Sequence, residues 1–124
     1  MLKVSALNSD AVEKILKEMG SKQKLKWVEF ITGESFTASY MDVKETYYKL
    51  NEKLFREGRI YFYEYLEMLG IGGPTFIDAQ NNAMKWDIFD NEIFGEAWIH
   101  PEFAVKMDDT GEVVFILQPS HDPV

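Results

Sequence analysis

The stretch MDVKETYYKLNEKLFRE, residues 41–57, carries the clearest single periodicity in the chain. Its apolar side chains recur every three or four positions, which places them on one face of an α-helix. These residues are Val43, Tyr47, Leu50 and Leu54. Tyr48 and Phe55 lie beside this stripe, and Asp42 followed by Glu45 resembles a capping box. The pattern predicts a helix over Met41–Glu57 that ends at Gly58.

Further helices are predicted on both sides of this segment. Residues Ile60–Leu69 continue directly after Gly58 with apolar positions on one side, and Gly70 supplies a C-terminal stop. The two helices would form a corner joined through a single glycine. Upstream, Ser9–Met19 has one apolar stripe, a capping residue before it and Gly20 after it, so it predicts an N-terminal helix.

Strand patterns fill most of the remaining sequence. Lys24–Thr32 is rich in β-branched and aromatic residues, which favours a short strand. Residues 78–82 are predicted as a polar loop, and residues 84–88 alternate between apolar and polar side chains. Residues 102–118 predict a hairpin, because two strand-like runs flank the turn sequence Asp108–Gly111.

These elements predict an α+β fold in which an N-terminal helix and a two-helix corner pack on a small, mainly antiparallel C-terminal sheet. A length of 124 residues suits a single domain. We expect residues 1–71 to be mainly helical and residues 72–118 to be mainly β. Residues 119–124 are expected to form a loose tail.

Composition excludes several classes of protein. Apolar residues make up 46% of the chain, so it can bury a core, and the absence of cysteine excludes disulfide scaffolds and thiolate metal sites. No segment approaches the length of an apolar membrane span or has the pattern of a signal peptide. The sequence therefore predicts a cytoplasmic protein that does not bind a membrane.

Charge is divided unequally along the chain. The net charge is −8, with ten basic and nine acidic residues in residues 1–58 but three basic and twelve acidic residues in residues 59–124. So many carboxylates with so few bases cannot all be paired internally, so they face water, an ion or a basic partner. Direct binding to nucleic acid is not expected, because it requires surplus lysine and arginine.

Tyrosines are concentrated close to these acids. Seven aromatic residues fall within residues 47–65, and they cannot all point inward from helices. One interpretation is that these aromatic side chains pack in the core. The other is that they form an exposed tyrosine patch suited to a protein interface. We predict an interaction surface formed by Tyr61, Tyr63, Glu64, Tyr65, Glu67, Asp87, Asp90 and Glu92.

Motifs for catalysis are not evident. A second acidic cluster could instead hold a divalent cation, because hard oxygen ligands suit Mg²⁺ or Ca²⁺. Its members are Asp87, Asp90, Glu92, Glu96 and His100. Their spacing does not match a calcium-binding loop, so no metal site, catalytic residue or cofactor is predicted.

One part of the sequence is similar to a known group. Asn51, Leu54, Gly58, Phe62 and the run YLEMLGI at residues 65–71 resemble a family of uncharacterised small proteins of phages and mobile elements in Gram-positive bacteria. That family has an adjacent Arg-Gly pair where this chain has Arg-Glu-Gly at residues 56–58. The resemblance implies a phage-like origin and an α+β layout, and it implies no activity.

The sequence thus predicts a non-enzymatic protein-interaction module whose partner is another protein with a basic surface. Two alternatives remain open. The chain could be an acidic inhibitor that occupies the nucleic-acid site of a host protein, or a divalent-metal-dependent protein that uses the acids of residues 87–100.

Overall fold

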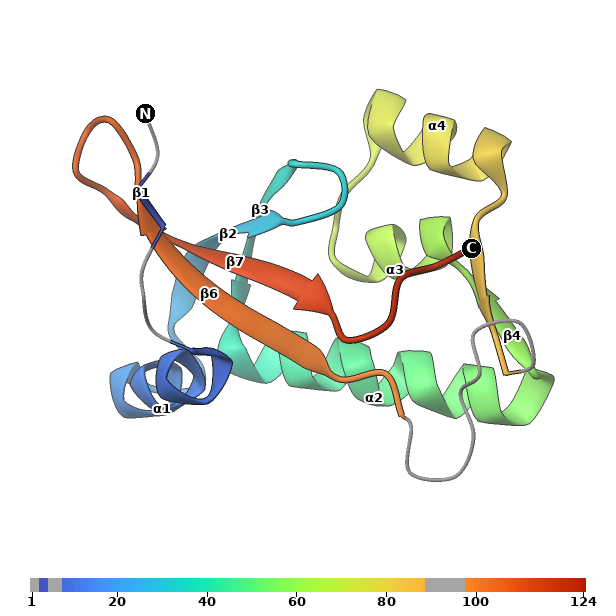
Figure 1. The fold of residues 1–124 in the computed structure, drawn as a ribbon, viewed down its shortest axis with the longest axis horizontal. Helices are drawn as coiled ribbons and strands as arrows, with labels where there is room; N and C mark the ends of the chain where they lie inside the picture. The colour runs from blue at the N-terminus through green and yellow to red at the C-terminus, as the bar shows by residue number, and fades with distance from the viewer. Residues whose placement is uncertain (1–2, 5–7, 89–97) are drawn as a thin grey trace. The chain divides into compact units, whose positions relative to one another are not determined.

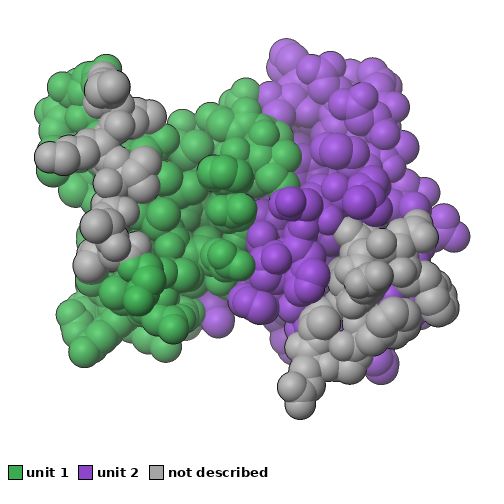
Figure 2. All heavy atoms as spheres, viewed as in Figure 1, with its two compact units in different colours: residues 1–43, 101–118 green, residues 44–100, 119–124 purple. Residues whose placement is uncertain are grey.

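The computed structural model describes residues 3–4, 8–88 and 98–124. It divides into two compact units, each built from separate parts of the chain and coloured separately in Figure 2. Unit 1 comprises residues 1–43 and 101–118, and unit 2 comprises residues 44–100 and 119–124. Helix α2 (Tyr40–Glu57) begins in unit 1 and continues into unit 2.

Unit 1 contains a five-stranded sheet with the strand order β1-β6-β7-β2-β3. Strand β1 is antiparallel to β6, β2 is antiparallel to β3, and β2 is parallel to β7. Figure 1 shows β6 and β7 running in opposite directions, as in the predicted hairpin. The elements are β1 (Lys3–Val4), α1 (Ser9–Met19), β2 (Lys24–Glu29), β3 (Ser35–Ser39), β6 (Pro101–Met107) and β7 (Val113–Pro119).

The α+β class is confirmed, but the sheet is not confined to the C-terminal half. Strands β1, β2 and β3 come from the first 39 residues, so the part expected to be mainly helical also supplies strands. The sequence pattern predicts β2 but not β3, which pairs with β2 in register Trp27↔Phe36. The alternating burial of β3 rests on Phe36 and the small Ala38 alone, too little for a clear pattern in the sequence.

The helices of unit 1 begin where local hydrogen bonds favour them. Asn8 Oδ1 accepts a hydrogen bond from Ala11 N at 2.9 Å, which caps α1 as predicted. Helix α2 is capped by Ser39, whose hydroxyl accepts from Asp42 N while the Asp42 carboxylate accepts from Ser39 N. The capping residue is therefore Ser39, and Asp42 occupies the third helical position rather than the cap.

Unit 2 joins the remainder of α2 to two short helices and a two-stranded sheet. Strands β4 (Arg59–Tyr61) and β5 (Lys85–Asp87) are antiparallel, with Ile60 opposite Trp86. Helix α3 (Phe62–Met68) follows β4 directly, and it packs against α4 (Gly73–Asn82).

Two predictions in this region are wrong. The helix expected from Ile60 begins at Phe62, because residues 59–61 are extended and pair with β5. The polar loop expected at residues 78–82 is the second half of α4. Pro74 lies in the first turn of this helix, where its missing N–H costs no hydrogen bond, so it is compatible with the start of the helix.

The C-terminal residues are held in place rather than loose. Lys85 and Val124 exchange two backbone hydrogen bonds, both of 2.8 Å, and the indole N–H of Trp86 donates to His121 O at 2.7 Å. Ser120 N also donates to His100 O. These bonds satisfy backbone groups on both sides, which explains why a short polar segment is ordered without an apolar pattern.

Each unit has its own aromatic core. In unit 1, Trp27 is completely buried and its indole N–H donates to Ala38 O. In unit 2, Trp86 is completely buried and lies perpendicular to Tyr65 at a ring separation of 5.5 Å. Leu54 is buried, as its place on the apolar stripe of residues 41–57 predicts, and Leu66 and Phe115 are buried as well.

Candidate interaction site

The predicted surface of tyrosines and acids is only partly a surface. Tyr65 is completely buried, and its hydroxyl shares a 2.7 Å hydrogen bond with the hydroxyl of Tyr47. Helical spacing explains this, because positions 62, 65 and 66 fall on one face of α3 and all three are buried. Tyr65 is thus a core residue of unit 2, and its placement in the interaction surface is corrected.

Glu64 has a structural role. Its carboxylate accepts a hydrogen bond from Tyr61 N at 2.9 Å, which caps α3, and it forms an ion pair with Lys53 of α2. The hydrogen bond that Lys53 donates to Glu64 raises the pKa of Lys53 above its usual value, and nearby negative charge adds to the shift. Because its charge is already matched within unit 2, Glu64 is poorly suited to attract a partner.

Tyr61 and Tyr63 are half-buried and stacked on each other. Their rings are 5.4 Å apart and nearly parallel, and Tyr63 also meets Phe76 edge-on at 5.8 Å. Together with neighbouring charged side chains they line a polar pocket of about 350 Å³. The pocket is lined by Lys53, Glu57, Arg59, Tyr61, Tyr63 and Glu64.

The remaining predicted acids are not brought together by the described structure. Glu67 is exposed on α3, and Asp87 lies half-buried on β5. Asp90 and Glu92 lie outside the described residues, as does Glu96 of the predicted cation cluster. Within residues 3–4, 8–88 and 98–124, no three acidic or histidine side chains gather in a way that could hold a metal ion.

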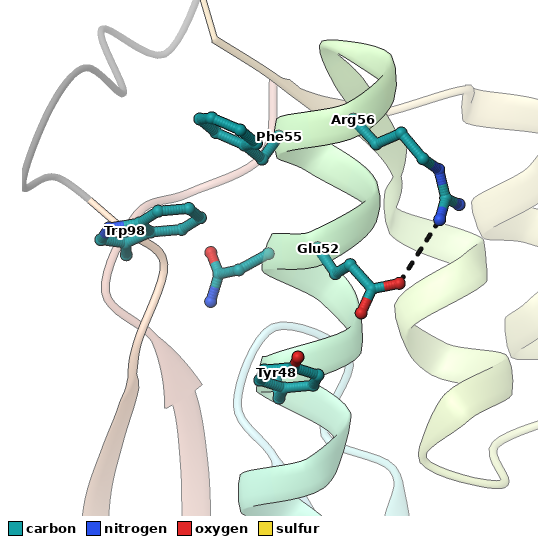
Figure 3. A pocket seen from close by; sticks show the side chains of 6 residues that line it. Tyr48, Glu52, Phe55, Arg56 and Trp98 are labelled. Carbon is teal, nitrogen blue, oxygen red and sulfur yellow. Dashed lines mark hydrogen bonds and ion pairs between the residues drawn. The ribbon is translucent and has the colours of Figure 1, made fainter.

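A different surface stands out on the outward face of α2. The side chains of Tyr48 and Phe55 are 70% and 76% exposed, although each follows a buried stripe residue. Residues seven apart lie on the same face of a helix, so both rings project from one side of α2 (Figure 3). Large apolar side chains this exposed, on one helix face, are not used for folding.

Trp98 completes this surface from another part of unit 2. Its ring is 44% exposed and lies 5.6 Å from the ring of Phe55, at an interplanar angle of 34°. Figure 3 shows the two rings close together, with Tyr48 further along the helix. We call this surface the aromatic groove; its volume is about 500 Å³, and it is lined by Tyr48, Asn51, Glu52, Phe55, Arg56 and Trp98.

Asn51 holds the groove in shape. Its amide nitrogen donates to Ile99 O at 2.6 Å and to Tyr47 O at 2.9 Å, while its amide oxygen accepts from Ile99 N at 3.0 Å. The side chain thus satisfies both backbone groups of Ile99, the residue next to Trp98. Ile99 is also 1% exposed, so an apolar anchor and an amide clamp together fix Trp98 against Phe55.

A second set of hydrogen bonds holds the other side of Trp98. His100 N donates to Ser120 Oγ at 3.0 Å, and Ser120 N donates to His100 O at 2.9 Å. Segment 98–100 is therefore fixed on α2 by Asn51 and on the C-terminal residues by Ser120. A groove held by four such bonds is organised before any ligand arrives, which reduces the entropy lost on binding.

Charged groups form one rim of the groove. Arg56 Nη1 lies 3.4 Å from Glu52 Oε1, and Arg56 Nη2 lies 3.4 Å from Glu57 Oε2, so one guanidinium forms ion pairs with two carboxylates. All three side chains are about half exposed or more. Glu52 and Arg56 line the groove, whereas Glu57 lines the polar pocket and adjoins the groove only through Arg56. The groove thus combines an apolar floor with one ion pair, and the second carboxylate beside Arg56 gives this charged rim one excess negative charge.

The sequence pattern places Tyr48 and Phe55 beside the buried stripe of α2 but does not predict the surface that they form. The available signal was that the buried stripe of the helix is complete without them, so two aromatics seven residues apart are left facing outward. No signal marked Trp98, because its pairing with Phe55 depends on the tertiary clamp at Asn51.

Comparisons of this chain with protein-family models, curated proteins and solved structures find no match. Within the described residues, no helix has the length and apolar character needed to cross a membrane.

Proposed function

We propose that this chain is a non-enzymatic protein-interaction module that docks a segment of a partner protein in the aromatic groove. The observation that carries the proposal is the exposed trio of Tyr48, Phe55 and Trp98, held in a preformed hollow. Aromatic side chains are enriched at protein interfaces, because they bury large areas with little loss of side-chain entropy. An origin in a phage or mobile element rests on the sequence resemblance alone.

Magnitudes favour binding over folding as the role of these rings. Complete burial of a phenylalanine side chain is worth roughly 1.5–3 kcal/mol relative to its exposed state. Phe55 is 76% exposed, so most of this free energy is not used within the described structure and is available to a partner. Two or three such rings around one pocket have the composition of a binding hot spot.

The lining of the groove is suited to binding a partner rather than to catalysis. Its lining supplies two amphipathic aromatics, a phenyl ring, an amide already engaged by Ile99, and an ion pair. Such a surface can enclose an apolar side chain and provide a polar border for its backbone. These features support a docking role and make no use of a cofactor.

An unbiased peptide selection tests the proposal. A displayed library of random peptides would be panned on the immobilised full chain and on the double variant Tyr48→Ala/Phe55→Ala. We expect families of peptides that bind the wild type and lose binding to the double variant. The matched control is Phe30→Ala, which removes an aromatic side chain of 55% exposure from unit 1 and should retain the same peptides. Equal binding to all three proteins would refute the groove as the docking site.

A further inference from the structure

We infer that the occupant of the aromatic groove is a basic segment, in which an apolar anchor side chain is flanked by lysine or arginine. This inference rests on the proposed function and specifies the chemistry of the partner. It begins from the charges at the rim. Glu52 and Glu57 both contact Arg56, so the guanidinium neutralises only one of the two carboxylates.

The surroundings carry the same sign of charge. Among the described residues of unit 2, six are lysine or arginine and eight are aspartate or glutamate. Several of its bases are already committed, since Lys49 pairs with Glu45 and Lys53 pairs with Glu64. An approaching acidic segment would meet surplus carboxylates, whereas a basic segment would be attracted to them.

The floor of the groove favours the same partner. Exposed rings of Phe55 and Trp98 present π faces, and an arginine or lysine side chain can place its charge over such a face. The aliphatic stem of that residue would cover apolar area at the same time. An apolar anchor in the hollow with a cation beside it would therefore use both the rings and the rim.

Nucleic acid is the competing occupant, because aromatic rings also stack on bases. Its phosphates require a positive surface, however, and among the residues that the structure describes the only cation lining the groove is Arg56, which already pairs with two carboxylates. The charge balance that favours a basic peptide thus disfavours an oligonucleotide.

Synthetic peptides of matched length test this inference on the full chain. Three 12-residue peptides would combine lysine with leucine, glutamate with leucine, and lysine with serine, and a 12-nucleotide oligothymidylate would be the fourth probe. Binding would be followed by tryptophan emission, because Trp27 and Trp86 are completely buried and Trp98 is exposed in the groove. We expect the lysine–leucine peptide to bind at least tenfold more tightly than each other probe, and binding to weaken as salt is raised.

Double variants test whether the carboxylates of Glu52 and Glu57 cause the preference for the lysine–leucine peptide. Glu52→Gln/Glu57→Gln should reduce the preference for the lysine–leucine over the glutamate–leucine peptide at least threefold. The double variant Glu18→Gln/Asp109→Asn makes the same change of charge at exposed positions of unit 1, and it should leave the preference unchanged. Tyr48→Ala/Phe55→Ala should weaken binding of the lysine–leucine peptide at least tenfold.

The outcomes separate this inference from the proposed function. Equal or tighter binding of the glutamate–leucine peptide would overturn the basic occupant and leave the groove as a docking site. Preferred binding of the oligonucleotide would overturn the inference in favour of nucleic acid. If selected peptides bind the groove but the lysine–leucine peptide does not, the inference fails while the proposed function stands. If neither selected nor synthetic peptides bind, both fail.

Discussion

Trp27 in unit 1 and Trp98 in unit 2 both lie against phenylalanine rings, yet they differ in almost every other respect. Trp27 is completely buried, its indole N–H donates to Ala38 O at 2.9 Å, and three phenylalanine rings surround it at 5.5–6.1 Å. Trp98 is 44% exposed and its ring neighbour Phe55 is 76% exposed. Similar ring geometry thus occurs once in a core and once on a surface.

The difference shows that contact between aromatic rings does not by itself define a core. Stability arises from apolar area removed from water and from polar groups that keep a partner after burial. Trp27 satisfies both conditions, whereas the Phe55–Trp98 pair leaves most of its apolar area in solvent. The first cluster holds the fold together, and the second is available to bind.

The largest expected effect is in the buried cluster. Trp27→Ala should lower the free energy of unfolding by about 3–5 kcal/mol, because it removes the ring that all three phenylalanines contact. Denaturant titration followed by circular dichroism would measure the change. A loss below about 1 kcal/mol would show that the cluster of unit 1 is not a packed core.

A neighbouring pair on α2 sharpens the comparison within one helix. Leu54 is 2% exposed and Phe55 is 76% exposed, although they are adjacent in sequence. Leu54→Ala should cost about 2–5 kcal/mol of unfolding free energy, whereas Phe55→Ala should cost less than about 0.5 kcal/mol. Equal losses in the same denaturation assay would contradict the assignment of Phe55 to a binding surface.

Asn51→Asp tests the clamp that positions Trp98. Aspartate keeps an acceptor for Ile99 N but loses the N–H donor to Tyr47 O and Ile99 O, and it brings a carboxylate towards both carbonyl oxygens. We expect a loss of about 1–3 kcal/mol in stability. Quenching of tryptophan emission by acrylamide should increase, because Trp98 would be released from Phe55. A stable variant with unchanged quenching would show that the clamp does not hold the groove.

The smallest effect concerns a buried carboxylate in unit 1. Glu29 is completely buried and accepts hydrogen bonds from Ile31 N and Thr32 N; burial raises its pKa, and these bonds offset part of the shift. The Glu29 carboxyl group therefore binds its proton more tightly in the folded state than in the unfolded state. At neutral pH the carboxyl group is ionised, and burying its charge lowers the stability of the folded state by the full amount. Wild type should gain stability relative to Glu29→Gln as pH falls from neutral towards the usual carboxyl range.

Asp42 provides the matching control for that measurement. Its pKa is lowered by the hydrogen bond from Lys24 and by the one from Ser39 N. Its stabilising contribution is therefore present above the usual carboxyl pKa and lost at more acidic pH, as the carboxylate is protonated. Denaturation at several pH values should show opposite trends for Glu29→Gln and Asp42→Asn relative to wild type. Parallel trends would contradict the assigned shift of Glu29.

The elements that were predictable from sequence are those whose pattern is local. Helices α1 and α2 and the hairpin of β6 and β7 follow from periodicity and turn residues within each segment. Strands β3 and β4 are short and are specified by their partners β2 and β5, so the sequence around them did not reveal them. Helix α4 was missed because its asparagines are typical of loops.

The candidate site was predictable only in its composition. An excess of aromatics and acids indicated an interaction surface, but the sequence analysis placed it on α3, where Tyr65 is buried and Glu64 is a cap. Choosing between α2 and α3 required knowledge of which helix faces meet solvent. The contribution of Trp98 required the tertiary hydrogen bonds of Asn51.

The central claim is that the aromatic groove binds a partner while contributing little to folding. Isothermal titration calorimetry of a selected peptide against Tyr48→Ala/Phe55→Ala, with Phe30→Ala as control, tests it most directly. We expect at least tenfold weaker binding to the double variant, with affinity for the control equal to that of wild type. Unchanged affinity of a folded double variant, or equal weakening by Phe30→Ala, would contradict the claim.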